Sequence, residues 1–289
     1  IAGKGHETTQ DYGKYILKIS DKKIVKKFNK NKILINNDKK LNNFILTNVL
    51  NKKSKLFFNN ISIDSRTKLK GNLFVAIKGK INNGNNFVNS ALLKGASGAI
   101  RSTTLNNKKN TYYFKNTLNF LKLFGSIKRD LSNSTFIGVT GSSGKTTLKT
   151  MIGEVLSNFS STYVSPKSYN NEFGVPLSLS NFRIDNKFCI FEIGMSKKGE
   201  IHKLSKMVKP NIGIITNIGE AHLENFTSTK DIAKAKAEII DNIDSNGHII
   251  LNRDDKFYHF HKKIAARKKL KVISFGFSKL SDIHVKKII

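Results

Sequence analysis

The sequence predicts an α/β protein: a small N-terminal α/β domain is followed by a larger parallel-sheet domain that we expect to be incomplete. Its 289 residues are enough for about two domains. After Ser134, apolar runs of strand length alternate with segments of helical spacing. Strands that alternate with helices form parallel, doubly wound sheets, and ligands bind beyond the carboxyl ends of their strands.

The segment from Lys18 to Asn43 is rich in lysine and asparagine and has only short apolar clusters. We expect a helix at 21–29 there and then a linker. The chain starts at Ile1 rather than methionine, and both of its ends resemble interrupted strands, so we expect it to be cut from a longer polypeptide. The predicted segments are 1–30, a linker at 31–43, a first domain at 44–131 and a second domain at 132–289.

Both predicted domains follow from hydrophobic spacing. In the first, we expect strands at 60–64, 73–77 and 99–100 and helices at 86–94 and 118–131. In the second, we expect strands at 135–140, 188–193, 212–216 and 248–251 and helices at 146–158 and 229–243.

The composition narrows the class of protein. Lysine and arginine number 51 against 20 acidic residues, for a net charge of +31. The lysines are dispersed among asparagines and isoleucines, as an AT-rich coding sequence would produce, which argues against nucleic acid as the partner. The positive field still favours anionic small molecules such as nucleotides. No apolar run approaches the roughly 20 residues that span a membrane, and the single cysteine, Cys189, is compatible with a reducing cytoplasm.

A phosphate-binding loop follows the strand at 135–140. It reads Gly141-Ser142-Ser143-Gly144-Lys145-Thr146-Thr147 and opens the next helix. In such a loop, backbone N–H groups converge on phosphate oxygens, the lysine reaches the β- and γ-phosphates, and the first threonine ligates Mg²⁺. The common form of this motif has a glycine at the position of Val139, so this loop has the narrower form Thr-Gly-x-x-Gly-Lys-Thr.

At this loop the sequence resembles the Mur ligase family of ATP-dependent amide-bond synthetases. Further segments in the same order resemble the branch that joins D-alanyl-D-alanine to UDP-N-acetylmuramoyl-tripeptide. The segments that carry the resemblance are 64–66, 71–76, 141–147, 168–177, 192–195, 199–201, 216–224 and 232–239. Residues 1–30 instead resemble the closing segment of the branch that adds the preceding diamino acid. The order suggests an internal piece of a fused polypeptide, with a joined gene pair as the alternative.

The resemblance implies the reaction and its partners. ATP phosphorylates the terminal carboxylate of the tripeptide, and the amine of D-alanyl-D-alanine then attacks the acyl phosphate. The implied cofactors are ATP, two Mg²⁺ ions and a carbamylated lysine. We expect a cytoplasmic monomer that neither enters a membrane nor binds nucleic acid.

The resemblance also implies residue roles near the loop. Glu192 would hold Mg²⁺ together with Thr146, His222 would serve a second metal, and Lys236 would be the carbamylated lysine. Asn252 would lie near the nucleotide. The alternatives are a strand-end acid, a hydrogen-bonded loop histidine and a solvated helix lysine.

On the substrate side, Ser65 and Arg66 are candidates for the UDP moiety, because arginine offers a fork for phosphate oxygens. Asn170, Asn171 and Glu172 are candidates for the peptide-bearing substrate. The alternatives are a turn capped by the preceding aspartate and a polar surface loop. Where the family often has Asp-Gly-His, this chain has Asn-Gly-Asn at 83–85, which puts that loop in doubt.

Two other readings of the whole chain stay open. One is a P-loop ATPase of another class, which clustered basic and aromatic residues would favour. The other is an inactive fragment, because the family has a further domain that closes over ATP. We expect the 289-residue chain to bind nucleotide weakly and to lack ligase activity by itself.

Overall fold

The computed structural model describes residues 10–11, 16–17, 38–79, 81–104, 109–220 and 225–286. Near the start of the chain, β1 (Gln10–Asp11) and β2 (Ile16–Leu17) form a short antiparallel pair. The helix expected at 21–29 lies outside the described residues, as does most of segment 1–30. The interpretation of that segment therefore stays a prediction.

The first domain is built on a four-stranded parallel sheet with the order β3-β4-β5-β6. This order follows the sequence, as expected for an α/β unit whose crossovers return in one direction. Its elements are α2 (Asp38–Leu50), β3 (Ile61–Ser62), β4 (Leu73–Val75), η2 (Gly84–Phe87), α3 (Val88–Leu93), β5 (Gly98–Arg101), β6 (Thr111–Tyr113) and α4 (Thr117–Asp130).

Helix α2 begins at Asp38, within the segment that the sequence assigns to the linker. Residues 38–43, which were assigned to the linker, form the first turns of α2. The reason is the spacing of Leu41, Ile45, Leu46 and Val49, which places all four on one buried face of the helix. The two lysines at the start of the helix and the asparagines beside the apolar residues interrupt this pattern in the sequence, although Asn42 is itself buried.

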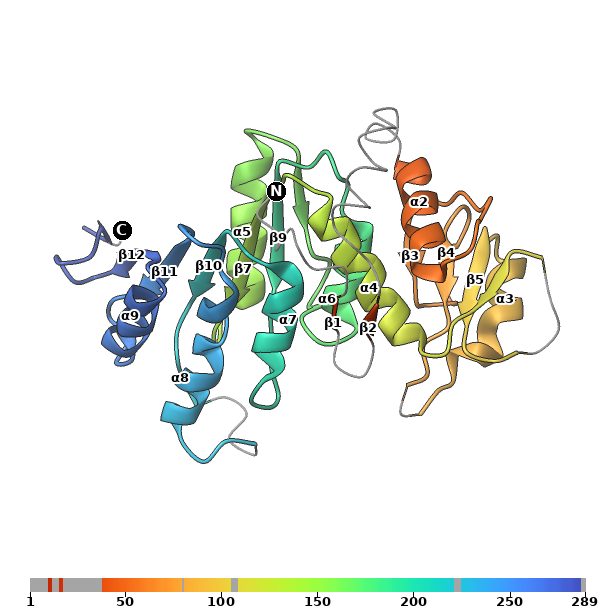
Figure 1. The fold of residues 1–289 in the computed structure, drawn as a ribbon. Helices are drawn as coiled ribbons and strands as arrows, with labels where there is room; N and C mark the ends of the chain where they lie inside the picture. Colours follow the sequence, from red (N-terminus) through yellow and green to blue (C-terminus); the bar gives the residue numbers. More distant parts are fainter. Residues whose placement is uncertain are drawn as a thin grey trace.

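The second domain contains a seven-stranded parallel sheet with the order β13-β12-β11-β10-β7-β9-β8 (Figure 1). It confirms the parallel, doubly wound sheet that the alternation of strands and helices predicted. Its elements are β7 (Thr135–Thr140), α5 (Lys145–Ser157), β8 (Thr162–Val164), α6 (Gly174–Asn181), β9 (Phe188–Glu192), α7 (Glu200–Val208), β10 (Ile212–Ile215), α8 (Thr229–Ala237), η4 (Ile240–Asn242), β11 (His248–Asn252), α9 (Tyr258–Arg267), β12 (Lys271–Gly276) and β13 (Ile283–His284).

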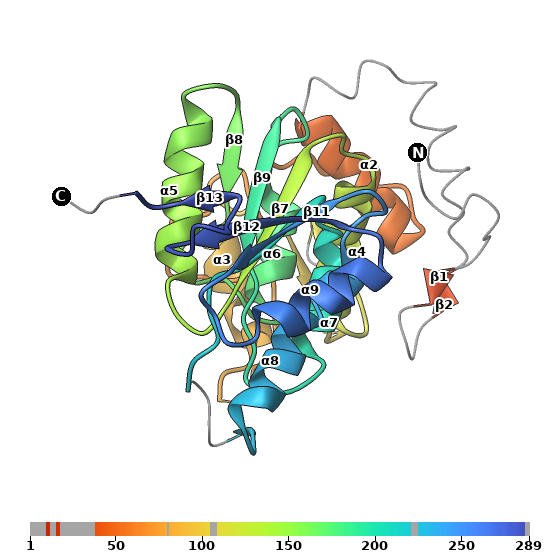
Figure 2. The ribbon, with the colours of Figure 1, turned by 90° about the vertical axis from the view of Figure 1, so that its left-hand side faces the viewer.

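Helices cover both faces of this sheet. Figure 2 shows α5 on one side of the strands and α7, α8 and α9 on the other. Alternate residues of β7 serve the two sides: Ile137 and Val139 pack with the α5 side, and Phe136 packs in the core beneath α7 and α8. Because both faces are buried, the strands are almost continuously apolar.

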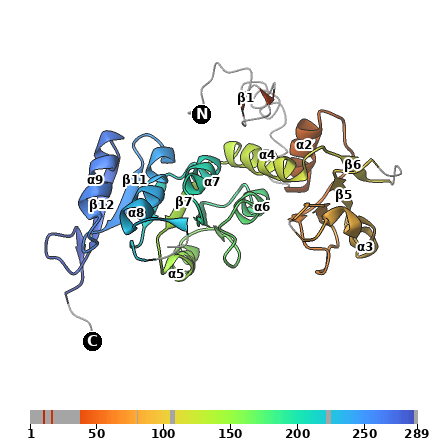
Figure 3. The same ribbon diagram turned by 90° about the horizontal axis from the view of Figure 1, so that it is seen from below.

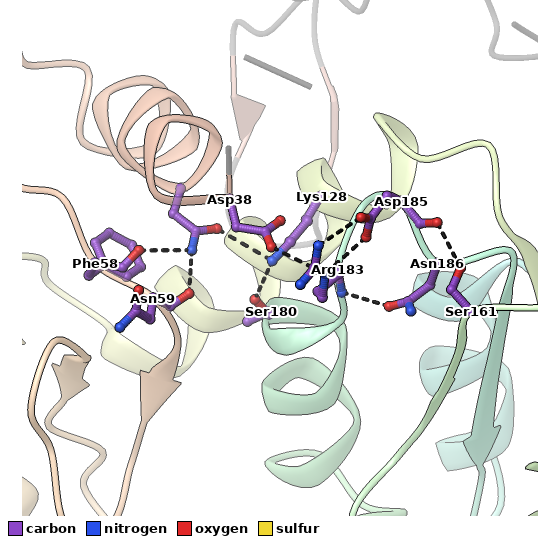
Figure 4. Close-up of polar contacts among 10 residues, drawn as sticks. Asp38, Phe58, Asn59, Lys128, Ser161, Ser180, Arg183, Asp185 and Asn186 are labelled. Atoms are coloured by element: carbon purple, nitrogen blue, oxygen red, sulfur yellow. Dashed lines mark hydrogen bonds and ion pairs between the residues drawn. The ribbon is translucent and has the colours of Figure 1, made fainter. Parts of the chain in front are cut away.

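Helix α4 lies between the two sheets and packs against α2 and α6 (Figure 3). Its Lys128 is fully buried and donates to the carbonyl oxygen of Ser180 at 3.1 Å and to Oδ1 of Asn42 at 3.4 Å (Figure 4). The amide of Asn42 in turn donates to the carbonyl oxygens of Phe58 and Asn59. The junction between the domains is thus a continuous, hydrogen-bonded core.

Asn181 adds a second link across this junction. Its Oδ1 accepts from the N–H of Ile61 at 2.7 Å, and its Nδ2 donates to the carbonyl oxygen of Ile61 at 2.9 Å. Ile61 lies on β3, the edge strand of the first sheet. The end of α6 therefore satisfies backbone groups that an edge strand would otherwise expose.

Among the helices of the described residues, none is both long and apolar enough to cross a membrane.

Candidate functional site

The predicted phosphate-binding loop lies at the carboxyl end of β7, where the order in which the chain adds strands to the sheet reverses. Strand β7 is flanked by β9 on one side and β10 on the other. After β7 the chain first builds β8 and β9, and then crosses to build β10 to β13. The carboxyl end of β7 is thus the topological switch point, where open α/β sheets bind their ligands.

The loop conformation requires a glycine at its first position. Gly141 has φ 148°, and a Cβ atom there would lie 1.8 Å from Oγ1 of Thr216. Thr216 is held in that place because its hydroxyl donates to the carbonyl oxygen of Ser143 at 2.7 Å. Gly144, at φ 76°, turns the chain into α5. The first N–H groups of α5 face the loop, as in an anion-binding helix start.

The segment after β10 fastens the loop from the other side. Oδ1 of Asn217 accepts from the N–H of Ser143 at 3.0 Å, and the Asn217 carbonyl oxygen accepts from the N–H of Ser142 at 2.9 Å. The hydroxyl of Ser142 donates to the carbonyl oxygen of Gly219 at 3.1 Å. The loop shape is therefore set in part by the segment that follows β10 rather than by the loop alone.

Lys145 folds back onto its own loop. Its Nζ donates to the carbonyl oxygens of Gly141 at 2.9 Å and Ser142 at 3.1 Å. Burial lowers the pKa of Lys145, while the carboxylate of Glu192 acts in the opposite direction. The amine is thus already at the loop where phosphate oxygens would lie.

Glu192 ends β9 beside the loop and is buried, at 1% exposure. Its Oε2 accepts from the hydroxyl of Thr146 at 2.7 Å, and its Oε1 accepts from the amide of Asn170 at 2.7 Å. A Cβ atom on Gly194 would lie 2.8 Å from the side chain of Asn170, so a glycine there lets Asn170 approach. The structure brings together Thr146, Glu192 and Asn170, which the sequence had placed on three separate segments.

Lys236 reaches the loop from α8. It is 2% exposed, and its Nζ donates to the carbonyl oxygen of Gly141 at 2.9 Å. Burial, reinforced by the nearby charge of Lys145, lowers the pKa of Lys236 to about 7. This lysine is therefore buried at the site, and the interpretation as a solvated helix lysine is wrong.

The donor set fits a hard divalent cation that shares its shell with phosphate. A hydroxyl, a carboxylate and an amide converge at Thr146, Glu192 and Asn170. Within the described part of the chain, no group of three or more His, Cys, Asp or Glu side chains could hold a metal. Mg²⁺ suits such a set, because it commonly takes one or two carboxylates and fills its shell with water and substrate phosphates.

Two predicted residues beside the loop are not placed in this cluster. His222 lies outside the described residues, so its metal role stays a prediction. Asn252 lies at the end of β11, where its Oδ1 accepts from the N–H of Asp254 at 3.0 Å. It lines a small pocket together with Asn217, which contacts the loop. Its role toward the nucleotide also stays a prediction.

Ser65 and Arg66 lie in the first domain, after β3. The guanidinium of Arg66 forms a two-pronged ion pair with Asp64, with Nε–Oδ1 at 2.9 Å and Nη2–Oδ2 at 2.8 Å. This pairing holds the pKa of Asp64 at about 2. The Ser65 carbonyl oxygen accepts from Lys94. The Arg66 side chain is 88% exposed, so it is open to a ligand while anchored at one edge.

The remaining substrate-side candidates differ in their hydrogen bonds and exposure. Oδ1 of Asn171 accepts from the N–H groups of Phe173 and Gly174, where α6 begins, and Glu172 is exposed. In the Asn-Gly-Asn loop, Asn85 accepts from the N–H of Ser102 and donates to its hydroxyl. That loop is held by the amide groups of its own asparagines, Asn83 and Asn85.

Sequence reasoning missed two residues of the site. Asn217 directly follows a predicted strand, so its place at the carboxyl edge of the sheet was a usable signal. Lys149 is buried on α5 with Nζ 3.5 Å from Oε2 of Glu192. Only its position one turn after Lys145 marked it, and lysines at such positions are usually solvated.

Comparison with known proteins finds relatives of this chain. The family model of the Mur ligase middle domain matches residues 139–289, more than half of the chain. A UDP-N-acetylmuramoyl-tripeptide–D-alanyl-D-alanine ligase of Rickettsia prowazekii is 35% identical over 225 residues, which cover 76% of this chain and 49% of that protein. The chain thus spans about half the length of the curated relatives it matches.

Solved structures of similar proteins share the fold of this chain. A crystal structure of MurF from Acinetobacter baumannii is similar with a TM-score of 0.76 and 30% identity, covering 86% of this chain and 55% of that one. MurF ligase from Thermotoga maritima in complex with ADP is similar with a TM-score of 0.70 and 30% identity, covering 81% and 54%.

Proposed function

The chain belongs to the Mur ligase family, and on that premise we propose that it carries the ATP site and the UDP-substrate domain of a ligase that joins D-alanyl-D-alanine to UDP-N-acetylmuramoyl-tripeptide. The observation that carries the proposal is the convergence of Lys145, Thr146 and Glu192 on one loop at the switch point of the sheet. The similarity to D-alanyl-D-alanine ligases of this family supports the choice of substrates.

The loop binds the phosphates of ATP. The first N–H groups of α5 and the ammonium of Lys145 meet the β- and γ-phosphate oxygens. Thr146 and Glu192 would hold Mg²⁺, which when bound neutralises charge on the phosphates. Asn170 keeps the Glu192 carboxylate oriented through its 2.7 Å hydrogen bond. Positioning and charge neutralisation supply most of the catalysis in such reactions.

The reaction has two covalent steps. A carboxylate oxygen of the tripeptide attacks the γ-phosphorus, its P–O bond to ADP breaks, and ADP leaves. The amine nitrogen of D-alanyl-D-alanine then attacks the acyl carbon and loses a proton, and inorganic phosphate leaves with its C–O bond pair. Asn171 and Glu172, beside Asn170, are the residues that we propose to face the peptide substrate.

Lys236 supplies a carbamate in this proposal. Burial and the Lys145 charge lower the pKa of Lys236 to about 7, so near neutral pH a large part of it is the free amine. The free amine attacks CO₂, the C–N bond forms, and one proton leaves to water, which converts the neutral amine into an anion. Such an anion removes the repulsion that a plain ammonium would exert on a metal beside Glu192.

Binding and turnover test the proposal. Titration of the chain with ADP and Mg²⁺ should give saturable binding that Lys145→Ala removes. Phosphate release from ATP should require both UDP-N-acetylmuramoyl-tripeptide and D-alanyl-D-alanine in the protein that carries this chain with the rest of the ligase. ATP hydrolysis that responds to nucleic acid and ignores both peptide substrates would instead support a P-loop ATPase of another class.

A further inference from the structure

We propose that Lys149 is the resident counter-cation of Glu192, and that this pairing makes a divalent metal bind here together with nucleotide phosphates rather than alone. The inference rests on the proposed ATP site and adds to it a residue that controls how the site takes up metal.

The geometry of Lys149 is that of a fixed charge. It lies on α5, one turn after Lys145, and the side chains of Lys149 and Glu192 are each 2% exposed. Nζ of Lys149 is 3.5 Å from Oε2 of Glu192, the same oxygen that accepts from the Thr146 hydroxyl. A metal that uses Thr146 and Glu192 must therefore bind within a few ångströms of this ammonium.

The ammonium is held there by more than its charge partner. Nζ donates to the carbonyl oxygen of Ser165 at 2.9 Å and also to that of Lys167. These two carbonyls follow β8 and precede Asn170, the other donor to Glu192. With two backbone acceptors and no exposure, Lys149 has no route to swing into solvent when a metal arrives, because doing so would leave buried groups unsatisfied.

The charge balance then decides what the site accepts. Glu192 is matched by Lys149, and Lys145 and Lys236 bring two further amines to the same loop. Before nucleotide binds, and while Lys236 is a free amine, a divalent cation would meet one neutralised carboxylate and the further ammonium of Lys145, and like charges repel strongly where water is excluded. Nucleotide phosphates reverse that balance, because they bring several negative charges and fill the remaining coordination positions.

Mn²⁺ binding measured by electron paramagnetic resonance tests this, with Mn²⁺ as the probe metal. In the absence of nucleotide, Lys149→Met should bind Mn²⁺ about tenfold more tightly than the wild type, because a fixed positive charge is removed beside the carboxylate. With ADP present, the difference between the two proteins should shrink. The double variant Lys149→Met/Glu192→Gln should lose the gain, since the carboxylate that Mn²⁺ uses is gone.

Lys128→Met is the matched control. Lys128 is also fully buried and also donates to a backbone carbonyl, that of Ser180, but it lies at the domain junction. It should leave Mn²⁺ affinity unchanged even if it lowers thermal stability as much as Lys149→Met does. Unchanged or weaker Mn²⁺ binding by folded Lys149→Met would overturn the proposal, because a purely structural lysine would give that result.

A stability measurement covers the case in which Lys149→Met does not fold. Removing both charges should then restore a folded chain in Lys149→Met/Glu192→Gln, since a buried pair replaced as a whole costs far less than a broken one. Failure of the double variant to fold would overturn the pairing. The ADP titration separates the two proposals: a wild type that binds no ADP sinks the ATP site, while the metal-only comparison still decides the role of Lys149.

Discussion

Lys145 and Lys236 both donate to the carbonyl oxygen of Gly141, each at a distance of 2.9 Å. One lysine comes from the start of α5 and the other from α8, so the loop is gripped by amines from both faces of the sheet. Burial lowers the pKa of both, and the charge of Lys145 lowers that of Lys236 further, to about 7. The loop thus contacts one amine, that of Lys236, whose pKa lies close to physiological pH.

The first prediction concerns how stability depends on pH. A lysine whose folded pKa of about 7 lies below its usual value of 10.5 binds fewer protons in the folded state between those two values. Stability therefore rises with pH across that window, by up to about 1.4 kcal/mol per pH unit. Lys236→Met should lower this slope in urea denaturation between pH 7 and 10, measured without CO₂ or divalent metal, while the buried Lys128, whose pKa burial lowers to about 8, keeps a slope of its own.

Lys234→Met is the control for that slope. Lys234 lies two residues away, is 48% exposed and pairs with Asp231, so its removal should leave the pH dependence as in the wild type. An unchanged slope in Lys236→Met would contradict the lowered pKa of the buried amine.

The sequence predicted only some of the elements whose hydrophobic period is uninterrupted, and α7, with Ile201, Leu204 and Val208 buried, was not among them. Strand β7 was placed at its observed bounds, and α4 and α5 to within one residue. The start of α2 was missed because lysines and asparagines dilute its apolar stripe. The predicted helix at 229–243 is split into α8 and η4, since the chain turns after Ala237 to bury Ile239 and Ile240.

Site residues that belong to a sequence motif could be predicted, whereas residues that reach the site only through the packing of the fold could not. The loop was predicted from its strand, glycines and lysine, and Glu192 was predicted from the resemblance. The ion pair of Glu192 with Lys149, by contrast, could not be predicted, because nothing in the linear sequence distinguishes that lysine from its many solvated neighbours. Whether an Arg such as Arg66 is already paired depends on a local turn, which spacing alone leaves open.

The second prediction concerns the first glycine of the loop. Gly141→Ala places a methyl group 1.8 Å from Oγ1 of Thr216, so the loop must move and ADP binding should be lost. We expect a stability cost of about 2–4 kcal/mol in chemical denaturation. Gly199→Ala is the control: it also has positive φ but meets nothing within 4 Å, and it should cost about 1 kcal/mol.

A suppressor sharpens that test. Adding Thr216→Ala to Gly141→Ala removes the nearest atom and leaves the next contact at 3.0 Å or more, so part of the stability should return. If the double variant is no more stable than Gly141→Ala, the clash with Thr216 is not the cause of the loss.

The third prediction concerns the link between the domains. Asn181→Ala leaves both the N–H and the carbonyl of Ile61 without the partner that now crosses the junction. We expect a loss of about 2–4 kcal/mol and a broader urea transition as the first domain loosens from the second. Asn158→Ala, which removes an exposed hydrogen bond within one helix turn, should change neither quantity. A sharp transition at wild-type stability in Asn181→Ala would contradict the link.

The last prediction separates binding from stability at Arg66. The Arg66 side chain is 88% exposed and its ion pair with Asp64 is local, so Arg66→Ala should leave the melting temperature unchanged. In the wild type, the edge of the Arg66 guanidinium that does not face Asp64 remains available to a diphosphate. Arg66→Ala should therefore weaken binding of the UDP-linked tripeptide by about tenfold, the usual size for one charge-assisted contact. Arg183 offers a matched control, because it forms the same two-pronged pair with Asp185 two residues away and is 67% exposed. In calorimetric titration, Arg183→Ala should bind the UDP-linked tripeptide as the wild type does, and equal losses in the two variants would show that net charge rather than a specific contact is responsible.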